Sequence, residues 1–146
     1  MREVVIVAAV RTAVGRSKGA LKDVRADDLA ADVLQEVVNR AGIEKVQVED
    51  VIFGCVTQSG EQGANIARTA LLMAGFPEKV PGVTIDRQCG SSQQAVHFGA
   101  QAILAGDMDI VIAGGVESMT RVPMFSNMQS AHKGKRLHEN HTIIHQ

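Results

Sequence analysis

The residues best able to do chemistry in this sequence lie in a short polar stretch, residues 86–92, around the cysteine Cys89. A strand-like apolar run ends at Ile85, and a helix-like run of small residues begins directly behind the cysteine. This order predicts a strand, a tight turn and a helix, which places Cys89 at a helix N-terminus. Unpaired N–H groups and the helix dipole favour an anion there. A thiol so placed loses its proton more readily, and the thiolate can form an acyl-enzyme with an activated carbonyl compound.

The chain holds two cysteines, and their neighbours distinguish them. Cys55 follows the strand-like run 51–54, which favours a structural residue or a pocket liner, because a lone cysteine in an apolar chain is usually a small buried hydrophobe. Cys89 has no apolar neighbour within two residues on either side. The residues alone leave two roles open for Cys89, a nucleophile or a buried hydrophobe.

Length and composition argue against several function classes. A length of 146 residues is that of one ordinary domain. The formal charge of −1 favours neither nucleic acid nor an anionic membrane surface as a partner. The chain also has no Trp or Tyr that could stack on bases. Two distant cysteines make neither a disulfide framework nor a zinc pattern. The seven apolar residues before Arg11 are too few for a signal peptide core, and no stretch is long enough to span a membrane. We therefore expect a cytoplasmic protein with reduced thiols.

Hydrophobic patterning predicts strands and helices in strict alternation. The predicted strands are residues 4–9, 51–53, 83–85 and 110–113, and the predicted helices are residues 27–41, 62–74 and 90–105. The order β-α-β-α-β-α-β with short connections predicts an α/β fold with a mostly parallel sheet. Ligands of such sheets bind beyond the carboxyl ends of the strands, and Cys89 follows one of those ends.

Residues 86–95, DRQCGSSQQA, resemble the acyl-cysteine signature of the thiolases, the acyl-CoA C-acyltransferases. Three further segments resemble the same family in order and spacing, namely residues 5–16, 63–68 and 113–120. Ser92 and Ile66 stand where many thiolases carry glycine and proline, which we interpret as variation within the family.

The resemblance implies a thiolase-like half-fold. Residues 1–116 would form the N-terminal thiolase domain, and residues 117–146 would begin an inserted loop domain that holds coenzyme A.

The resemblance also implies an activity for the intact protein, with Cys89 as its catalytic nucleophile. Cys89 would attack a 3-ketoacyl-CoA, release acetyl-CoA and pass the shortened acyl group to a fresh coenzyme A. Run backward, the same site would join two acetyl-CoA molecules. Coenzyme A is then a substrate and product rather than a bound cofactor. The resemblance also implies that the protein is a homodimer or a homotetramer.

Three residues near the C-terminal end are interpreted, from the resemblance, as contacts of coenzyme A: Lys133, Arg136 and His145. The basic pair could meet its phosphates, and His145 stands in a stretch that resembles the family's segment beside the acyl-pantetheine pocket. The residues alone favour a solvated surface. His141 and His145 would share a helix face, but only Glu139 is at hand to complete a ligand set, so no metal is expected.

A thiolase draws its activating histidine and its acid/base cysteine from the C-terminal half of the family pattern. Neither Cys55 nor His97 stands in a matching motif, so we expect little or no turnover from residues 1–146 alone. Two alternatives stay open. One is a ketoacyl or hydroxymethylglutaryl synthase with the same fold and cysteine. The other is a non-catalytic module for oligomerisation or acyl-CoA binding.

Overall fold

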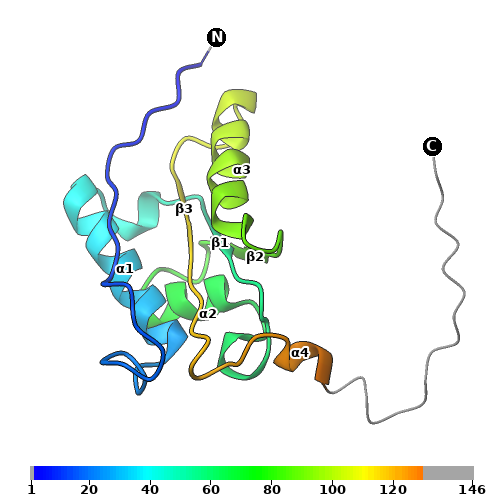
Figure 1. Ribbon diagram of the computed structural model, residues 1–146. Coiled ribbons are helices and arrows are strands. Elements are labelled where there is room, and N and C mark those ends of the chain that lie inside the picture. The colour runs from blue at the N-terminus through cyan, green and yellow to red at the C-terminus, as the bar shows by residue number, and fades with distance from the viewer. Residues whose placement is uncertain (1, 130–146) are drawn as a thin grey trace, which may run out of the picture.

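Three parallel strands form one sheet in the computed structural model, which describes residues 2–129 of the chain (Figure 1). Strand β1 (Asp50–Gly54) lies in the middle, between β2 (Gly82–Ile85) and β3 (Val111–Gly115). Gly54 is in register with Ile85 on one side and with Gly115 on the other. The three strands therefore end in one row, which is the carboxyl edge of the sheet. This confirms the predicted α/β fold with a parallel sheet.

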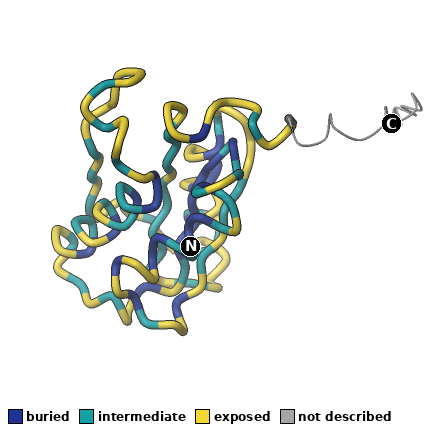
Figure 2. The backbone as a smooth tube through the Cα atoms, turned by 90° about the horizontal axis from the view of Figure 1, so that it is seen from below, coloured by how far each residue is buried: buried dark blue, intermediate teal, exposed yellow. Residues whose placement is uncertain are grey.

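Helices cover both faces of this sheet (Figure 1). Helix α3 (Ser91–Ala105) lies on one face, and α1 (Ala26–Ala41) and α2 (Ile66–Met73) lie on the other. Figure 2 marks the buried positions along the backbone. The largest buried cluster joins β1 to α1 and α2, with Phe53, Leu34 and Leu71 fully enclosed. Two 3₁₀ turns, η1 (Lys45–Gln47) and η2 (Gly60–Gln62), lie in the connections, and a short α4 (Ser126–Gln129) follows β3.

Helix α1 forms where its sequence pattern predicts. Ala30, Leu34 and Val38 recur every four residues and are buried on one side of the helix. Gly42 ends the helix in the left-handed conformation, with φ 66°, and closes it with N–H bonds to the last turn.

Helix α2 begins at Ile66, four residues later than the predicted helix 62–74. Ala64 and Asn65 both have positive φ, 51° and 66°, which a right-handed helix cannot contain. The Asn65 side chain instead caps the helix by accepting a hydrogen bond from the Arg68 N–H at 3.3 Å.

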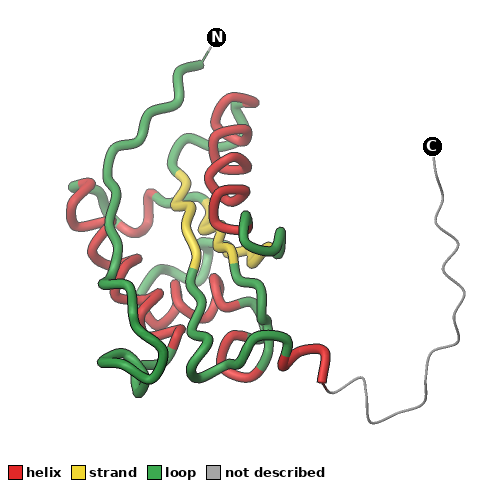
Figure 3. The backbone as a smooth tube through the Cα atoms, in the orientation of Figure 1, coloured by secondary structure: helices red, strands yellow, loops and turns green. Residues whose placement is uncertain are grey.

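The strand predicted at residues 4–9 is not formed, and this part of the prediction is wrong. The segment runs beside α1 as an irregular stretch, and Val5, Ile6 and Val7 are 64%, 79% and 72% exposed (Figure 3). Arg2 donates to Asp109, two residues before β3, and the Lys18 N–H donates to Thr120 Oγ1 beyond the end of that strand.

A groove of about 1110 Å³ separates the segment from β3, α1 and α3. A β-branched run is stable as a parallel strand when both of its faces are covered, and here its side chains meet the groove instead of a packed layer. The apolar pattern therefore predicted a burial that the described residues do not supply.

Within residues 2–129, no helix combines the length and the apolar content that a membrane crossing requires.

Candidate active site

The chain turns tightly between the end of β2 and the start of α3 (Figure 3). Cys89 lies in this turn. Its side chain is exposed, four residues beyond Ile85 and two residues before Ser91, the first residue of the helix. The structure thus forms the predicted sequence of strand, turn and helix around the cysteine, at the carboxyl edge of the sheet.

The turn is held by hydrogen bonds that converge on Ser91. The Ser91 hydroxyl accepts from the Arg87 N–H at 2.8 Å and donates to the Gln88 carbonyl oxygen at 2.6 Å. The Gln88 N–H donates to Asp86 Oδ1 at 2.8 Å, and the Gly90 N–H donates to the Arg87 carbonyl oxygen at 3.1 Å. Each residue from Asp86 to Ser91 other than Cys89 contributes a donor or an acceptor to this set.

The start of α3 sits directly on two glycines of the sheet. A Cβ atom placed on Gly54 would lie 2.7 Å from Ser91 Cβ, and one placed on Gly115 would clash with the Ser92 hydroxyl. These glycines end β1 and β3, side by side in the register. Because neither has a side chain, the first residues of α3 approach the sheet backbone closely.

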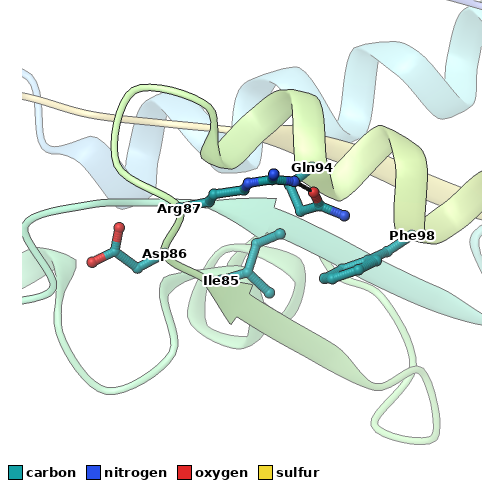
Figure 4. Close-up of a pocket in the computed structure, with 5 residues that line it drawn as sticks. All are labelled: Ile85, Asp86, Arg87, Gln94 and Phe98. Carbon is teal, nitrogen blue, oxygen red and sulfur yellow. Dashed lines mark hydrogen bonds between the residues drawn. The ribbon is translucent and has the colours of Figure 1, made fainter. Parts of the chain in front are cut away.

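A shallow pocket of about 420 Å³ lies on the other side of the turn, between β2 and α3. Figure 4 shows the Arg87 guanidinium reaching along α3 to Gln94 Oε1, to which it donates, while Asp86 points away from this pair. Ile85 and Phe98 form the apolar part of the lining (Figure 4). The Arg87 side chain therefore fixes the turn to the second turn of the helix.

The loops that follow β1 and β3 are joined by a buried polar network. Gln62 is 0% exposed, and its Nε2 donates to the Thr57 carbonyl oxygen at 2.9 Å and to Glu117 Oε1 at 2.8 Å. Its Oε1 accepts from the Ser118 N–H at 2.6 Å. The Glu117 carboxylate also accepts from the N–H groups of Val56 and Thr57, at 2.8 and 3.2 Å.

Sequence reasoning missed this network and placed Gln62 at the start of a helix. No local pattern could have found it, because its partners Glu117 and Ser118 lie more than fifty residues away in sequence.

Cys55 belongs to the same network and differs sharply from Cys89. It is 1% exposed, immediately after β1, which agrees with a structural thiol. Burial, together with the smaller effect of the neighbouring Glu117 carboxylate, raises the pKa of the Cys55 thiol to about 12. Cys55 is therefore held as a neutral thiol, whereas Cys89 is open to solvent.

An outer cluster of ion pairs ties α1 to the loops of the carboxyl edge. Glu61 pairs with Arg121 at 2.6 Å, and Arg25 pairs with Asp27 at 2.6 Å and approaches Glu61 at 3.9 Å. The hydrogen bond from Arg25 lowers the pKa of Asp27, and the one from Arg121 lowers the pKa of Glu61. This cluster fixes the chain where it leaves β3.

Asn65, the N-cap of α2, and Arg68 in its first turn bind β2 and the loop before it. Asn65 Nδ2 donates to the Gly82 carbonyl oxygen at 2.7 Å, and Asn65 Oδ1 accepts from the Thr84 hydroxyl at 2.8 Å. Arg68 donates to the carbonyl oxygens of Glu78 and Val80. These contacts fix the strand that leads into the Cys89 turn.

The other residues singled out in the sequence are not brought to Cys89. His97 lies on an exposed face of α3, eight residues beyond the cysteine. Lys133, Arg136, His141 and His145 lie outside the described residues. Among residues 2–129 no group of three His, Cys, Asp or Glu side chains could hold a metal ion.

Residues 4–145 match the family model described as the N-terminal domain of thiolase. The chain is 52% identical to a steroid 3-ketoacyl-CoA thiolase of Mycobacterium tuberculosis over 128 residues, which cover 88% of this chain and 31% of that protein. It is also 52% identical to a 3-ketoacyl-CoA thiolase of Yersinia pestis over 126 residues, covering 85% of this chain and 33% of that protein.

A similar solved structure is the acetyl-CoA acetyltransferase of Bacillus anthracis. It superimposes with a TM-score of 0.78 at 50% sequence identity, over 82% of this chain and 30% of that one. The chain therefore spans about a third of the length of the curated relatives it matches.

Proposed function

This chain belongs to the thiolase family, and on that premise we propose that the whole protein is an acyl-CoA C-acyltransferase whose nucleophile is Cys89. The relatives named above are 3-ketoacyl-CoA thiolases and an acetyl-CoA acetyltransferase, which supports a 3-ketoacyl-CoA or acetyl-CoA substrate.

In the cleavage direction, the Cys89 thiolate attacks the 3-keto carbonyl carbon of a 3-ketoacyl-CoA. A sulfur–carbon bond forms and the bond between carbons 2 and 3 breaks. The electron pair stays on carbon 2, which takes up a proton and leaves as acetyl-CoA. The thiolate of a second coenzyme A then attacks the thioester. This releases the shortened acyl-CoA and returns the electron pair to the Cys89 sulfur.

The observation that carries the proposal is the placement of an exposed cysteine in the turn between β2 and α3. In this proposal the Cys89 backbone N–H, just before the first residue of α3, donates to the oxygen of the carbonyl under attack.

The test is to trap the acyl-enzyme. Full-length protein is mixed briefly with acetoacetyl-CoA, quenched in acid, digested and examined by mass spectrometry. We expect the mass of one acetyl group on the peptide that contains Cys89 and none on the peptide that contains Cys55. Cys89→Ala should abolish both the adduct and turnover, and a Cys89→Ala protein with normal turnover would overturn the proposal.

The reaction also needs an acid/base group within hydrogen-bond reach of the sulfur. The one histidine among residues 2–129, His97, lies eight residues past Cys89, which is about 12 Å along a helix axis. We therefore propose that a polypeptide of residues 1–146 alone turns over slowly or not at all, although its Cys89 reacts with iodoacetamide faster than Cys55. Turnover by that polypeptide at the rate of the full-length protein would contradict this.

We also propose that residues 117–146 begin a second domain after the domain of residues 1–116, and that Lys133, Arg136 and His145 contact coenzyme A. Exchange of Lys133 and Arg136 for alanine should raise the KM for coenzyme A several-fold and leave kcat nearly unchanged. Lys79→Ala, at an exposed lysine before β2, is the control. An unchanged KM in the Lys133 and Arg136 variant would remove these residues from the site.

Finally, we propose that the whole protein is a cytoplasmic homodimer or homotetramer. Among residues 2–129 the outer edge of β2 pairs with no other strand, and the exposed Val83 and Phe98 lie beside it. Sedimentation equilibrium of the full-length protein should give the mass of two or four subunits, and a monomer at micromolar concentration would contradict the assembly.

A further inference from the structure

The Ser91 hydroxyl makes two hydrogen bonds that close the Cys89 turn from within. It accepts from the Arg87 N–H at 2.8 Å and donates to the Gln88 carbonyl oxygen at 2.6 Å. Ser91 is 4% exposed, so solvent has little access to replace these bonds if the hydroxyl is removed. One buried side chain therefore ties the first residue of α3 to both residues that precede the cysteine.

Gln88 needs such a tie because its backbone is in the left-handed region, with φ 50°. A residue with a side chain avoids this region unless its surroundings hold it there. The Gln88 N–H is held by Asp86 Oδ1, and its carbonyl oxygen is held by the Ser91 N–H at 3.1 Å and by the Ser91 hydroxyl. Ser91 is also packed against the sheet, because a Cβ atom on Gly54 would lie only 2.7 Å from Ser91 Cβ.

Because Cys89 follows Gln88 directly, the Gln88 conformation sets the direction in which the cysteine side chain leaves the backbone. We infer that Ser91 is a positioning residue that aims the Cys89 sulfur at the substrate by holding Gln88 in its left-handed conformation. This inference rests on the proposed role of Cys89. In this role Ser91 acts through the backbone, by its bonds to Arg87 and Gln88, and takes no chemical part in the reaction.

The first experiment compares Ser91→Ala with Ser92→Ala in the full-length protein. The Ser92 hydroxyl faces Gly115 and makes none of the turn's hydrogen bonds, so Ser92→Ala controls for the loss of a hydroxyl at the start of α3 without loss of the tie to Gln88. We expect Ser91→Ala to lower kcat by about ten- to a hundredfold, as small misplacements of a reacting group do, with KM changed much less. Iodoacetamide should also alkylate its Cys89 more slowly, and Ser92→Ala should stay close to wild type in both assays.

A second substitution tests the mechanism itself. Glycine enters the left-handed region without steric cost, so Gln88→Gly in the Ser91→Ala background should restore most of the lost kcat. Gln88→Ala in the same background removes the same side chain but keeps Cβ, and should not restore it. A residue that only stabilises the fold would show no such difference between glycine and alanine, and equal kcat in the two double variants would overturn the inference.

Should Ser91→Ala fail to fold, Ser91→Thr and Ser91→Val make the same test, because their side chains have nearly the same shape and only threonine keeps the hydroxyl. We expect the threonine variant to be the more active by about tenfold, with the loss again in kcat. Equal activities would reject Ser91 as a positioning residue. The proposed function fails separately, through a Cys89→Ala protein that keeps normal turnover.

Discussion

Gly54 and Ser91 meet backbone to backbone at the carboxyl edge of the sheet. A Cβ atom on Gly54 would lie 2.5 Å from the Ser91 carbonyl carbon and 2.7 Å from Ser91 Cβ. Real Cβ atoms do not come this close to backbone atoms, so the strand can carry no side chain here. The position of α3, and of the cysteine that precedes it, therefore depends on the lack of a side chain at Gly54.

Gly54→Ala should therefore displace the start of α3. We expect a stability loss of about 1–3 kcal/mol from overpacking and a clear fall in the rate at which iodoacetamide alkylates Cys89. Urea denaturation and alkylation kinetics measure the two effects.

Gly114→Ala is the control for this substitution. A Cβ at Gly114 would lie 3.4 Å from the Phe53 ring, an ordinary contact on the opposite face of the sheet. It should leave Cys89 alkylation unchanged. Equal effects of the two substitutions on alkylation would show that α3 is not seated on Gly54.

Glu117→Gln should destabilise the protein. In the native protein the Glu117 carboxylate accepts from several N–H groups with both of its oxygens, and the glutamine amide would replace one of these oxygens by a donor. The carboxylate accepts from Val56, Thr57 and Gln62. Leaving partly buried donors unpaired costs about 1–3 kcal/mol, which chemical denaturation can measure.

Glu36→Gln is the matched control for Glu117→Gln. Glu36 pairs with Arg40 on the exposed side of α1, and such a pair contributes about 0.3–0.5 kcal/mol. The same loss from both variants would contradict the structural role of Glu117.

The raised pKa of Cys55 predicts that the folded protein loses stability in alkaline solution. Its pKa is raised from 9.0 to about 12 in the folded chain, so the neutral thiol contributes stability that is fully present below pH 9. Between pH 9 and 12 the unfolded chain releases this proton while the folded chain keeps it, and the free energy of unfolding falls. Cys55→Ser does not ionise in this range and should show a weaker decline from pH 8 to 10.5 in urea titrations. Identical declines would mean that Cys55 is not the group responsible.

The lowered pKa of Asp27 predicts that the folded protein loses stability in acid. The hydrogen bond from Arg25 lowers its pKa below the usual 3.8, so its contribution is present above that pH and is lost as the pH falls through the folded value. Asp27→Asn should remove this part of the acid dependence, measured as the midpoint of thermal unfolding between pH 6 and pH 2.5. Asp32→Asn, on the same helix, is the control and should keep the acid dependence of the wild type. A wild-type acid profile in Asp27→Asn would contradict the assignment.

The sequence was sufficient to predict the parts of the fold that rest on local patterns. The stripe of Leu34 and Val38 predicted α1, and residues 83–105 predicted a strand, a turn with the cysteine, and a helix. These features depend on residues a few positions apart, which periodicity and turn chemistry describe well.

What the sequence did not reveal depends on distant contacts. Gln62 precedes an apolar run that is typical of a helix, which is why the sequence predicted a helix start there. Its bonds to Glu117 and Ser118 instead make it a buried link between two loops. The run 4–9 has the composition of a buried strand, yet burial also needs neighbours that a local pattern does not contain. The left-handed Gln88 likewise has no sequence signal, because glycine or asparagine would be the usual residue there.

The exposed run 4–9 also bears on how the protein behaves in concentrated solution. Among residues 2–129 the outer edge of β3 pairs with no strand, and Val5 to Val7 lie exposed near it. Unpaired edges and β-branched apolar runs are the elements through which chains aggregate edge to edge. The charged residues Arg2, Glu3 and Arg11 flank the run at both ends and so act as gatekeepers against such growth.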